Sequence, residues 1–244
     1  MTVLPNNPKI LIAGATSPSG AATAAALSAA GASVIAVGTN PARLNKLSEV
    51  AEGITSYVCD LADAEEVDRF AAQLHHDAGP VDGLIHLVGG WRGGGGIAGQ
   101  SDEDWDFLHR NVVTTLRNTS RAFYADLLAA DNGRLAIVSS TAASKPTASG
   151  ANYAAVKAAA EAWTFAVADG FRRAQSGRKE DPEPQRAAAA AFIIKALVDD
   201  TMRAENPDRA FAGYTDVRDL GDAVVRFMAA DAETVNGTRI SLTD

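Results

Sequence analysis

The sequence KILIAGATSPSG, residues 9–20, decides the fold of this chain. The apolar run at residues 9–13 predicts a buried strand, and the turn that follows begins at Gly14 and ends at Gly20. Glycines in such a turn allow the backbone to approach a pyrophosphate closely at the N-terminus of a helix. A turn with a purely structural role is the alternative that this stretch alone leaves open.

The residues after this turn decide between the two interpretations. Residues 21–30 are rich in alanine and predict a helix, with Gly31 as its C-cap. Residues 33–37 are apolar and predict a second strand. Strand, glycine-containing turn, helix and strand within about thirty residues form a βαβ unit of the dinucleotide-binding kind. This context favours the nucleotide-binding interpretation.

The same alternation continues to the end of the chain. Five further strands are expected at residues 54–59, 81–88, 134–139, 187–198 (most clearly 191–194) and 238–242. Helices are expected between them at residues 41–52, 63–78, 101–130, 154–168 and 215–230. We therefore predict one Rossmann-type α/β domain spanning residues 1–244, a doubly wound, seven-stranded parallel sheet with helices on both faces. Residues 172–186, which are polar and charged with two prolines, are interpreted as an exposed or partly disordered insertion.

Composition excludes several classes of function. The formal net charge of −8 argues against nucleic acid or an anionic membrane as the main partner. A single cysteine, Cys59, cannot form an intrachain disulfide and favours a reducing compartment. The first residues lack the pattern of a signal peptide, and no apolar run approaches the ~20 residues of a membrane span. No metal-ligand spacing is evident. We expect a soluble, cytoplasmic protein.

Candidate catalytic side chains lie in the second half of the chain. Tyr153 and Lys157 are four residues apart in a predicted helix, so they share one face. A cation beside a phenol stabilises the phenolate and lowers the pKa, which makes Tyr153 a candidate acid/base. The same spacing also occurs by chance on many helices. Ser140, at the end of a predicted strand, falls at the sheet edge where α/β proteins bind ligands.

Taken together, these motifs resemble the short-chain dehydrogenases/reductases over essentially the whole chain. The residues that carry the resemblance are the turn at 14–20, Asp60-Leu61, Asn111, Ser139-Ser140, the pair Tyr153 and Lys157, and Thr201-Met202. Ser140 lies thirteen residues before Tyr153, as is usual in that family. Several motifs in the right order make a chance occurrence of the tyrosine–lysine pair far less probable.

The resemblance implies an NAD(P)-dependent oxidoreductase that acts on a carbonyl or alcohol. Tyr153 would donate or remove the proton, Lys157 would lower the pKa of Tyr153 and hold the nicotinamide ribose, and Ser140 would bind the substrate oxygen. Asn111 would anchor a water that links Lys157 to solvent. The cofactor-binding residues implied are Gly14, Thr16, Ser17, Gly20, Thr39, Arg43, Asp60, Leu61, Gly89, Lys157 and Thr201. Family members are commonly dimers or tetramers, so a homo-oligomer is expected.

The chain departs from the family pattern at four places. Pro18 replaces the middle glycine of the turn and removes one N–H donor. Residues 86–89 (His-Leu-Val-Gly) keep only the glycine of the family's Asn-Asn-Ala-Gly, and residues 195–197 replace its Pro-Gly. The insertion at residues 172–186 is longer than usual. These departures make a non-catalytic dinucleotide-binding regulator the alternative function. A sugar-nucleotide epimerase or dehydratase is disfavoured because those enzymes add a C-terminal substrate domain, and 244 residues are short for that arrangement.

The choice between NAD and NADP depends on the end of the second strand. NAD-binding members usually carry an acid there and NADP-binding members a basic residue. Residues 38–40 (Gly-Thr-Asn) contain neither, and Arg43 is the nearest cation. Without an acid to repel a 2′-phosphate, the sequence favours NADP. The substrate pocket is expected to include the glycine-rich loop around Trp91 and Arg92, and residues 199–214.

Overall fold

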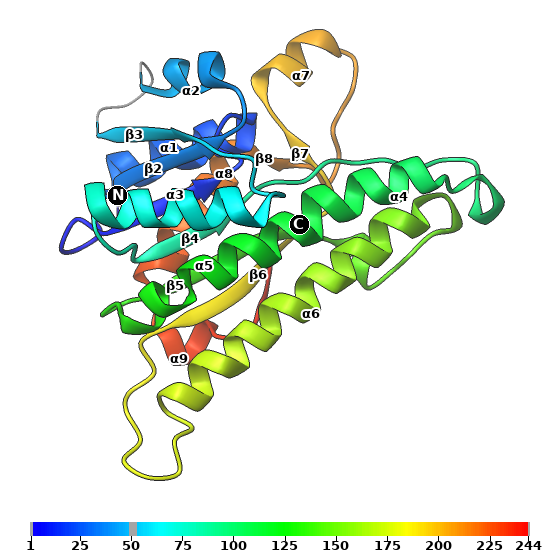
Figure 1. Cartoon of the computed structure of the whole chain (residues 1–244). Coiled ribbons are helices and arrows are strands. Elements are labelled where there is room, and N and C mark those ends of the chain that lie inside the picture. The colour runs from blue at the N-terminus through cyan, green and yellow to red at the C-terminus, as the bar shows by residue number, and fades with distance from the viewer. Residues whose placement is uncertain (1, 49–52, 244) are drawn as a thin grey trace.

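The structure, a computed structural model, describes residues 2–48 and 53–243. These residues form a seven-stranded parallel sheet with the order β3-β2-β1-β4-β5-β6-β9 (Figure 1). The strands are β1 Lys9–Ala13, β2 Ser33–Gly38, β3 Ile54–Val58, β4 Gly83–His86, β5 Arg134–Ser140, β6 Ala188–Ile194 and β9 Arg239–Ser241. The predicted α/β class and parallel sheet are therefore confirmed.

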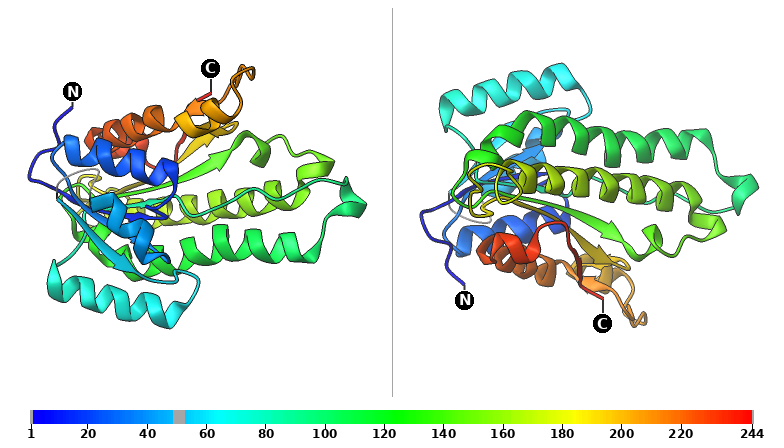
Figure 2. Two further views of the ribbon diagram at one scale, coloured as in Figure 1. Left: turned by 90° about the horizontal axis from the view of Figure 1, so that it is seen from above. Right: turned by 90° about the horizontal axis from the view of Figure 1, so that it is seen from below.

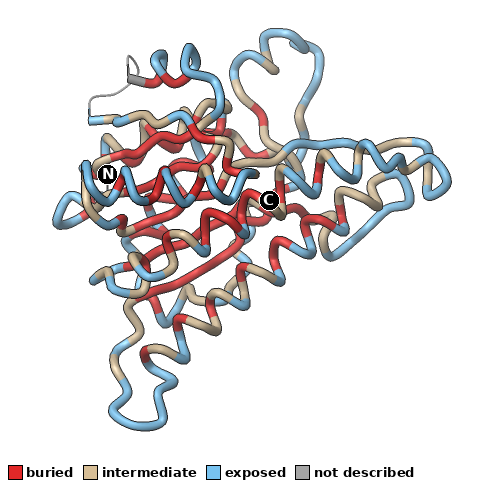
Figure 3. Tube along the Cα trace, in the orientation of Figure 1, coloured by how far each residue is buried: buried red, intermediate tan, exposed pale blue. Residues whose placement is uncertain are grey.

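Helices cover both faces of the sheet, as the two views of Figure 2 show. One face carries α3 Ala64–Asp77, α5 Thr115–Ala129 and α6 Ala151–Ala174, which pack against Leu11 and Ala13 of β1. The other face carries α1 Pro18–Ala29, α2 Pro41–Ser48 and α8 Val217–Ala229, which pack against Ile10 and Ile12. Successive side chains of a strand point to opposite faces, so the apolar run of β1 supplies both cores. The inner strands β1, β2, β4, β5 and β6 are accordingly almost wholly buried, whereas the edge strands β3 and β9 are partly exposed (Figure 3).

The strand order determines where the binding crevice lies. β1 pairs with β2 on one side and with β4 on the other, so the chain runs outward from β1 in both directions. In open α/β sheets, ligands bind outside the carboxyl ends of the strands at such a switch point. The turn after β1 and the loop after β4 meet there.

The predicted helix at residues 101–130 is interrupted. It consists of α4 Asp102–Leu108, a π-helical turn over His109–Thr114, and α5. Side chains bond backbone carbonyls four residues earlier in this turn: Asn111 Nδ2 donates to the carbonyl of Phe107 (2.8 Å), and Thr115 Oγ1 donates to the carbonyl of Asn111 (2.6 Å). Single π-helical turns of this kind occur often at functional sites.

Other boundaries also differ from the predicted ones. α1 begins at Pro18 rather than at residue 21, because proline is favoured at the first position of a helix. The predicted strand at 187–198 divides into β6 and the short β7 Leu197–Val198, which pairs with β8 Thr215–Asp216 before α8 begins. The short helices α7 Asp200–Glu205 and α9 Ala232–Val235 were not predicted. The expected end of α2 near residue 52 lies outside the described residues.

The polar insertion is also more ordered than the sequence indicates. Residues 172–174 are the last turn of α6, and the backbone nitrogens of Arg186 and Ala187 donate to Gln175 Oε1 at 2.9 and 3.0 Å. Gln175 is buried, so it closes the base of the loop. Between these ends the loop is exposed, and Glu183 forms ion pairs within it. Within residues 2–48 and 53–243, none of the helices has the length and apolar character that crossing a bilayer requires.

Candidate active site

A cavity of about 830 Å³ opens at the carboxyl ends of the central strands. Its wall includes residues that follow β1, β2, β3, β4, β5 and β6, together with residues from the π-helical turn and the start of α6. Twelve of the residues predicted from sequence lie in this wall: Gly14, Thr16, Ser17, Thr39, Arg43, Asp60, Leu61, Gly89, Asn111, Ser140, Tyr153 and Lys157. The fold therefore brings together side chains that are up to about 140 positions apart in the chain.

The turn after β1 is built around its two glycines and Ser17. Gly14 has φ of +82°, and a Cβ there would lie 2.9 Å from the backbone nitrogen of Val88. Gly20 does not line the cavity. A Cβ on Gly20 would lie 2.5 Å from the carbonyl oxygens of Gly14 and Ala15, so it allows α1 to pack closely against the turn. Ser17 caps α1 by accepting from the backbone N–H of Gly20 at 3.0 Å.

Pro18 fits this turn without strain on the helix. It occupies the first helical position, where an N–H would have no partner within the helix. Its side chain is exposed, while Ser17 and Ser19 on either side line the cavity. The substitution therefore leaves the helix start intact and removes one donor at the cavity wall.

The side of the cavity formed by β2 and β3 holds the residues expected around the adenosine. Thr39 and Arg43 line it, and Arg43 is exposed. Asp60 is already engaged, because its Oδ2 pairs with Arg110 at 2.6 Å and its Oδ1 accepts from the N–H of Ala62 at 3.0 Å. The Arg110 ion pair was not foreseen from the sequence.

The candidate catalytic group lies where β5 meets α6. The Ser140 hydroxyl, at the end of β5, hydrogen-bonds the phenol of Tyr153. One helical turn further, Lys157 is buried and its Nζ donates to the carbonyl of Val138 at 2.8 Å. Nζ also lies 5.7 Å from the centre of the Tyr153 ring.

Burial dominates the ionisation of this group. It raises the pKa of Tyr153, and the hydrogen bond from Ser140 opposes that shift. It also lowers the pKa of Lys157 to about 8, against an opposing effect of the Glu161 carboxylate. The sequence predicts that Lys157 lowers the pKa of Tyr153. In the structure the larger effect is the loss of water around both groups, which disfavours both charged forms.

Asn111 reaches the cavity from the π-helical turn. Two buried residues next to it, Thr115 and His86, were not among the site residues predicted from the sequence. Thr115, which donates to the Asn111 carbonyl, is buried and also contacts His86 Nε2 at 3.0 Å. Because the Thr115 proton is used on Asn111, His86 Nε2–H is the donor in the second bond. Burial lowers the pKa of His86 to about 3, so the imidazole is neutral. His86 stands in the altered strand motif, which is the signal that could have pointed to it.

The other end of the cavity lies away from β2 and β3, beyond the ends of β4, β5 and β6. Trp91, Lys145 and Lys195 line it, while Arg92 turns away, with its guanidinium 4.4 Å from the centre of the Phe107 ring. The last residue of the wall is Leu197. Residues 199–214, which were expected to line the substrate pocket, therefore lie outside the wall.

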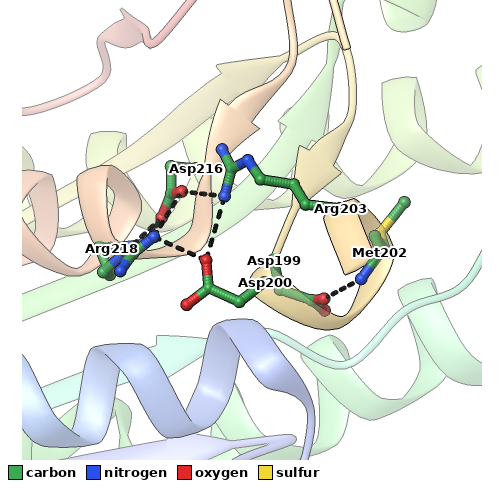
Figure 4. A network of polar contacts seen from close by, with 6 residues as sticks. All are labelled: Asp199, Asp200, Met202, Arg203, Asp216 and Arg218. Carbon is green, nitrogen blue, oxygen red and sulfur yellow. Dashed lines mark hydrogen bonds and ion pairs between the residues drawn. The ribbon is translucent and has the colours of Figure 1, made fainter. Parts of the chain in front are cut away.

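Ion pairs link the segment beyond Leu197 to the start of α8. Arg203 of α7 pairs with Asp216 at 2.6 Å, and Arg218 pairs with Asp200 at 2.9 Å (Figure 4). The Arg218 guanidinium, with a smaller contribution from Arg203, holds the pKa of Asp216 well below its usual range. Thr201 is exposed on α7 and lies outside the cavity wall.

The charge of the cavity is opposite to that of the whole chain. In the part of the wall that the structure describes, four side chains are basic (Arg43, Lys145, Lys157 and Lys195) and one is acidic (Asp60). The acid is paired with Arg110. A glycine turn at a helix N-terminus, a switch point and a cationic wall suit a dinucleotide with its pyrophosphate. The fold and the site thus define a Rossmann-type protein with a dinucleotide-binding cavity.

Comparison with known proteins agrees with this class. The family model for short chain dehydrogenases matches residues 8–175. A 2,3-dihydro-2,3-dihydroxybenzoate dehydrogenase of Bacillus subtilis is 34% identical over 157 residues, which cover 63% of this chain and 60% of that protein. A 3-oxoacyl-(acyl-carrier-protein) reductase of Vibrio harveyi is 25% identical over 93% of this chain and 92% of that protein. A short chain dehydrogenase of Shigella flexneri, solved in complex with NADP, superposes with a TM-score of 0.84 at 21% identity, and the match covers 99% of each chain.

The chain therefore belongs to the short chain dehydrogenase family, a family of oxidoreductases.

Proposed function

We propose that the protein is an NADP-dependent oxidoreductase that interconverts a carbonyl compound and its alcohol, with Tyr153 as the acid/base. The observation that carries the proposal is the contact between the Tyr153 phenol and the Ser140 hydroxyl beside buried Lys157 in the cavity wall. The bound dinucleotide supplies or accepts the hydride.

Each side chain of this group has a role in the proposed reaction. Tyr153 donates its proton to the carbonyl oxygen during reduction and takes it back from the alcohol during oxidation. Ser140 hydrogen-bonds the same oxygen and stabilises the negative charge that develops on it. Lys157 holds the ribose and favours the phenolate. Asn111 faces the same cavity and orders a water on the path from Lys157 to solvent.

NADP is favoured over NAD by the charges around the adenosine side. Arg43 lines the cavity near Thr39, and the Asp60 carboxylate is neutralised by Arg110. A 2′-phosphate would meet a cation there and no uncompensated acid. The Shigella relative, which shares this fold, is complexed with NADP. The names of the two curated relatives, a dihydroxybenzoate dehydrogenase and a 3-oxoacyl reductase, support an alcohol or carbonyl substrate.

The test combines cofactor binding with turnover. NADPH and NADH are titrated by fluorescence, and NADPH oxidation is then followed with a panel of ketones and aldehydes. We expect NADPH to bind more tightly, and Tyr153→Phe to lower kcat by about 10²- to 10⁴-fold with little change in the Kd for NADPH. Tyr124→Phe is the matched control, because that phenol stacks on Phe171 outside the cavity.

Three outcomes would count against the proposal in different ways. Full activity of Tyr153→Phe would refute the assigned mechanism. Binding of NADPH without turnover of any carbonyl would favour the non-catalytic regulator. Tighter binding of NADH would overturn the choice of cofactor while leaving the reaction class intact.

A further inference from the structure

Three side chains of α6 contact three consecutive residues of β5. Tyr153, Lys157 and Glu161 are spaced by four residues and share one face of the helix. The contacts of the first two, to Ser140 and Val138, are described above. The third contact involves Ser139, which lies between Val138 and Ser140 on β5: Ser139 Oγ donates to Glu161 Oε1 at 2.5 Å. The mechanism proposed above uses the first two contacts and leaves the third unexplained.

Glu161 is a buried carboxylate with both oxygens engaged. Its side chain is only 8% exposed, and its Oε2 lies 3.3 Å from Nη1 of Arg239 in β9. Arg239 is 37% exposed and also donates through Nη2 to Ser144 in the loop after β5 at 3.4 Å. Burial of a charge is unfavourable unless it is paired and hydrogen-bonded. Glu161 therefore ties together α6, the end of β5 and, through Arg239, the last strand.

The charges around Lys157 give this carboxylate a second effect. Lys157 faces neutral His86 from β4, the uncharged phenol of Tyr153 on its own helix, and the Val138 carbonyl from β5. The Glu161 carboxylate acts on it from one turn away and favours its cationic form, against burial. Arg239 pairs with Oε2 of that carboxylate, the oxygen that does not bond Ser139, and offsets part of its charge.

We propose that Glu161 is a positioning residue that keeps Lys157 cationic and, through Ser139, holds the end of β5 against α6. This rests on the proposed function insofar as Lys157 serves the reaction. Ser140 follows Ser139 directly, so the bond to Glu161 fixes the strand that carries the substrate-binding hydroxyl. Arg239 moderates the effect of Glu161 on Lys157.

The direct test is the ionisation of Lys157, which needs no substrate. Lysine ¹³Cε resonances are followed by NMR against pH in the full-length protein, and the Lys157 signal is assigned by its loss in Lys157→Met. Glu161→Gln keeps the side-chain size and an acceptor for Ser139, but removes the charge. We expect the pKa of Lys157 to fall by about one unit in this variant, because an opposite charge one helical turn away is lost.

Two further variants separate charge from structure. Arg239→Gln removes the competing cation, so it should shift the pKa of Lys157 in the opposite direction, upward, by a smaller amount. Asp169→Asn is the matched control: it removes one negative charge from the same helix, three turns from Lys157. At a rise of about 1.5 Å per residue and a Debye length of about 8 Å, it should leave the pKa of Lys157 unchanged.

The effect on turnover is measured in the holoenzyme. Above its pKa, Lys157 loses its proton, so the alkaline limb of the rate profile for NADPH-dependent reduction should move to lower pH in Glu161→Gln and to higher pH in Arg239→Gln. Ser139→Ala keeps the carboxylate but removes the tie to β5. It should lower kcat several-fold without moving this limb as far as Glu161→Gln does.

The outcomes are distinguishable from a failure of the proposed function. A Lys157 pKa that is the same in Glu161→Gln, Asp169→Asn and the wild type overturns the inference, whether or not the protein turns over carbonyls. Should Glu161→Gln fail to fold, Arg239→Gln decides: an upward shift supports the inference and an unchanged pKa refutes it. Opposite shifts in a protein without turnover would uphold the role of Glu161 and refute the proposed function alone.

Discussion

Replacing Pro18 with glycine should tighten cofactor binding while weakening the fold. Pro18 stands at the first position of α1, between two serines that line the cavity. A glycine there adds one backbone N–H to the helix terminus that is expected to hold the pyrophosphate. It also removes the restraint that the proline ring places on the unfolded chain.

The two effects can be set against each other. A hydrogen bond to a charged group contributes about 1.5–3 kcal/mol. Fixing the backbone of a residue that glycine leaves mobile costs about 1 kcal/mol when the phosphate binds. The difference is about 1 kcal/mol in favour of binding, or roughly fivefold in Kd. The free energy of unfolding should fall by about 1 kcal/mol in the same variant, since the unfolded state gains freedom.

Titration of NADPH by fluorescence measures the first quantity, and urea denaturation without cofactor measures the second. Pro5→Gly is a suitable control, because Pro5 is exposed near the N-terminus and outside the cavity wall. That variant should bind NADPH like the wild type. An unchanged or higher Kd in a folded Pro18→Gly protein would show that residue 18 does not face a phosphate, and the assignment of this turn would then fail.

Three further predictions concern the scaffold and its ionisation. Arg134→Met should lower the free energy of unfolding by about 3 kcal/mol in urea titrations, because this fully buried guanidinium donates to four backbone carbonyls; a loss below 1 kcal/mol would contradict its role. Gly20→Ala should raise the Kd for NADPH at least tenfold or prevent folding, since its Cβ would lie 2.5 Å from the carbonyl of Ala15, and normal binding would refute this packing. The pKa of Lys157 is lowered to about 8 in the folded protein, so between pH 8 and 10 the unfolded chain holds a proton on Lys157 that the folded protein has released. The free energy of unfolding should therefore rise with pH, relative to that of Lys157→Met, by up to about 3 kcal/mol. A flat difference between these two proteins in urea titrations would show that Lys157 is not buried as described.

Local patterns were enough to predict the scaffold. The apolar run of β1, the glycine turn and the alanine-rich helix follow from propensity and periodicity, which act over a few residues. The parallel sheet then follows from the alternation of strands and helices. Residues at the ends of predicted strands, such as Ser140, could be assigned to one site because carboxyl ends of parallel strands share one edge.

Features set by distant contacts could not be predicted. The contact of Thr115 with His86, which lies behind the π-helical turn, joins two elements that are 29 positions apart in the chain. The helix α7, which carries Thr201 outside the cavity, forms ion pairs with Asp216 and Arg218, which lie 13 and 18 positions further along the chain than their partners. None of these pairings is visible in a local pattern, because each needs the fold before its partners can meet.

The ionisation of the active site depends both on the spacing of residues in the sequence and on the burial that the fold produces. Sequence spacing places Lys157 one turn from Tyr153, but only burial shows that the phenol is held in its protonated form. At neutral pH this group therefore has a proton to give, which is the state needed to reduce a carbonyl. Lys157, with a pKa of about 8, is mostly cationic under the same conditions and can stabilise the phenolate once that proton has left. Oxidation of an alcohol needs Tyr153 to start as phenolate, so raising the pH should favour oxidation over reduction until Lys157 loses its charge.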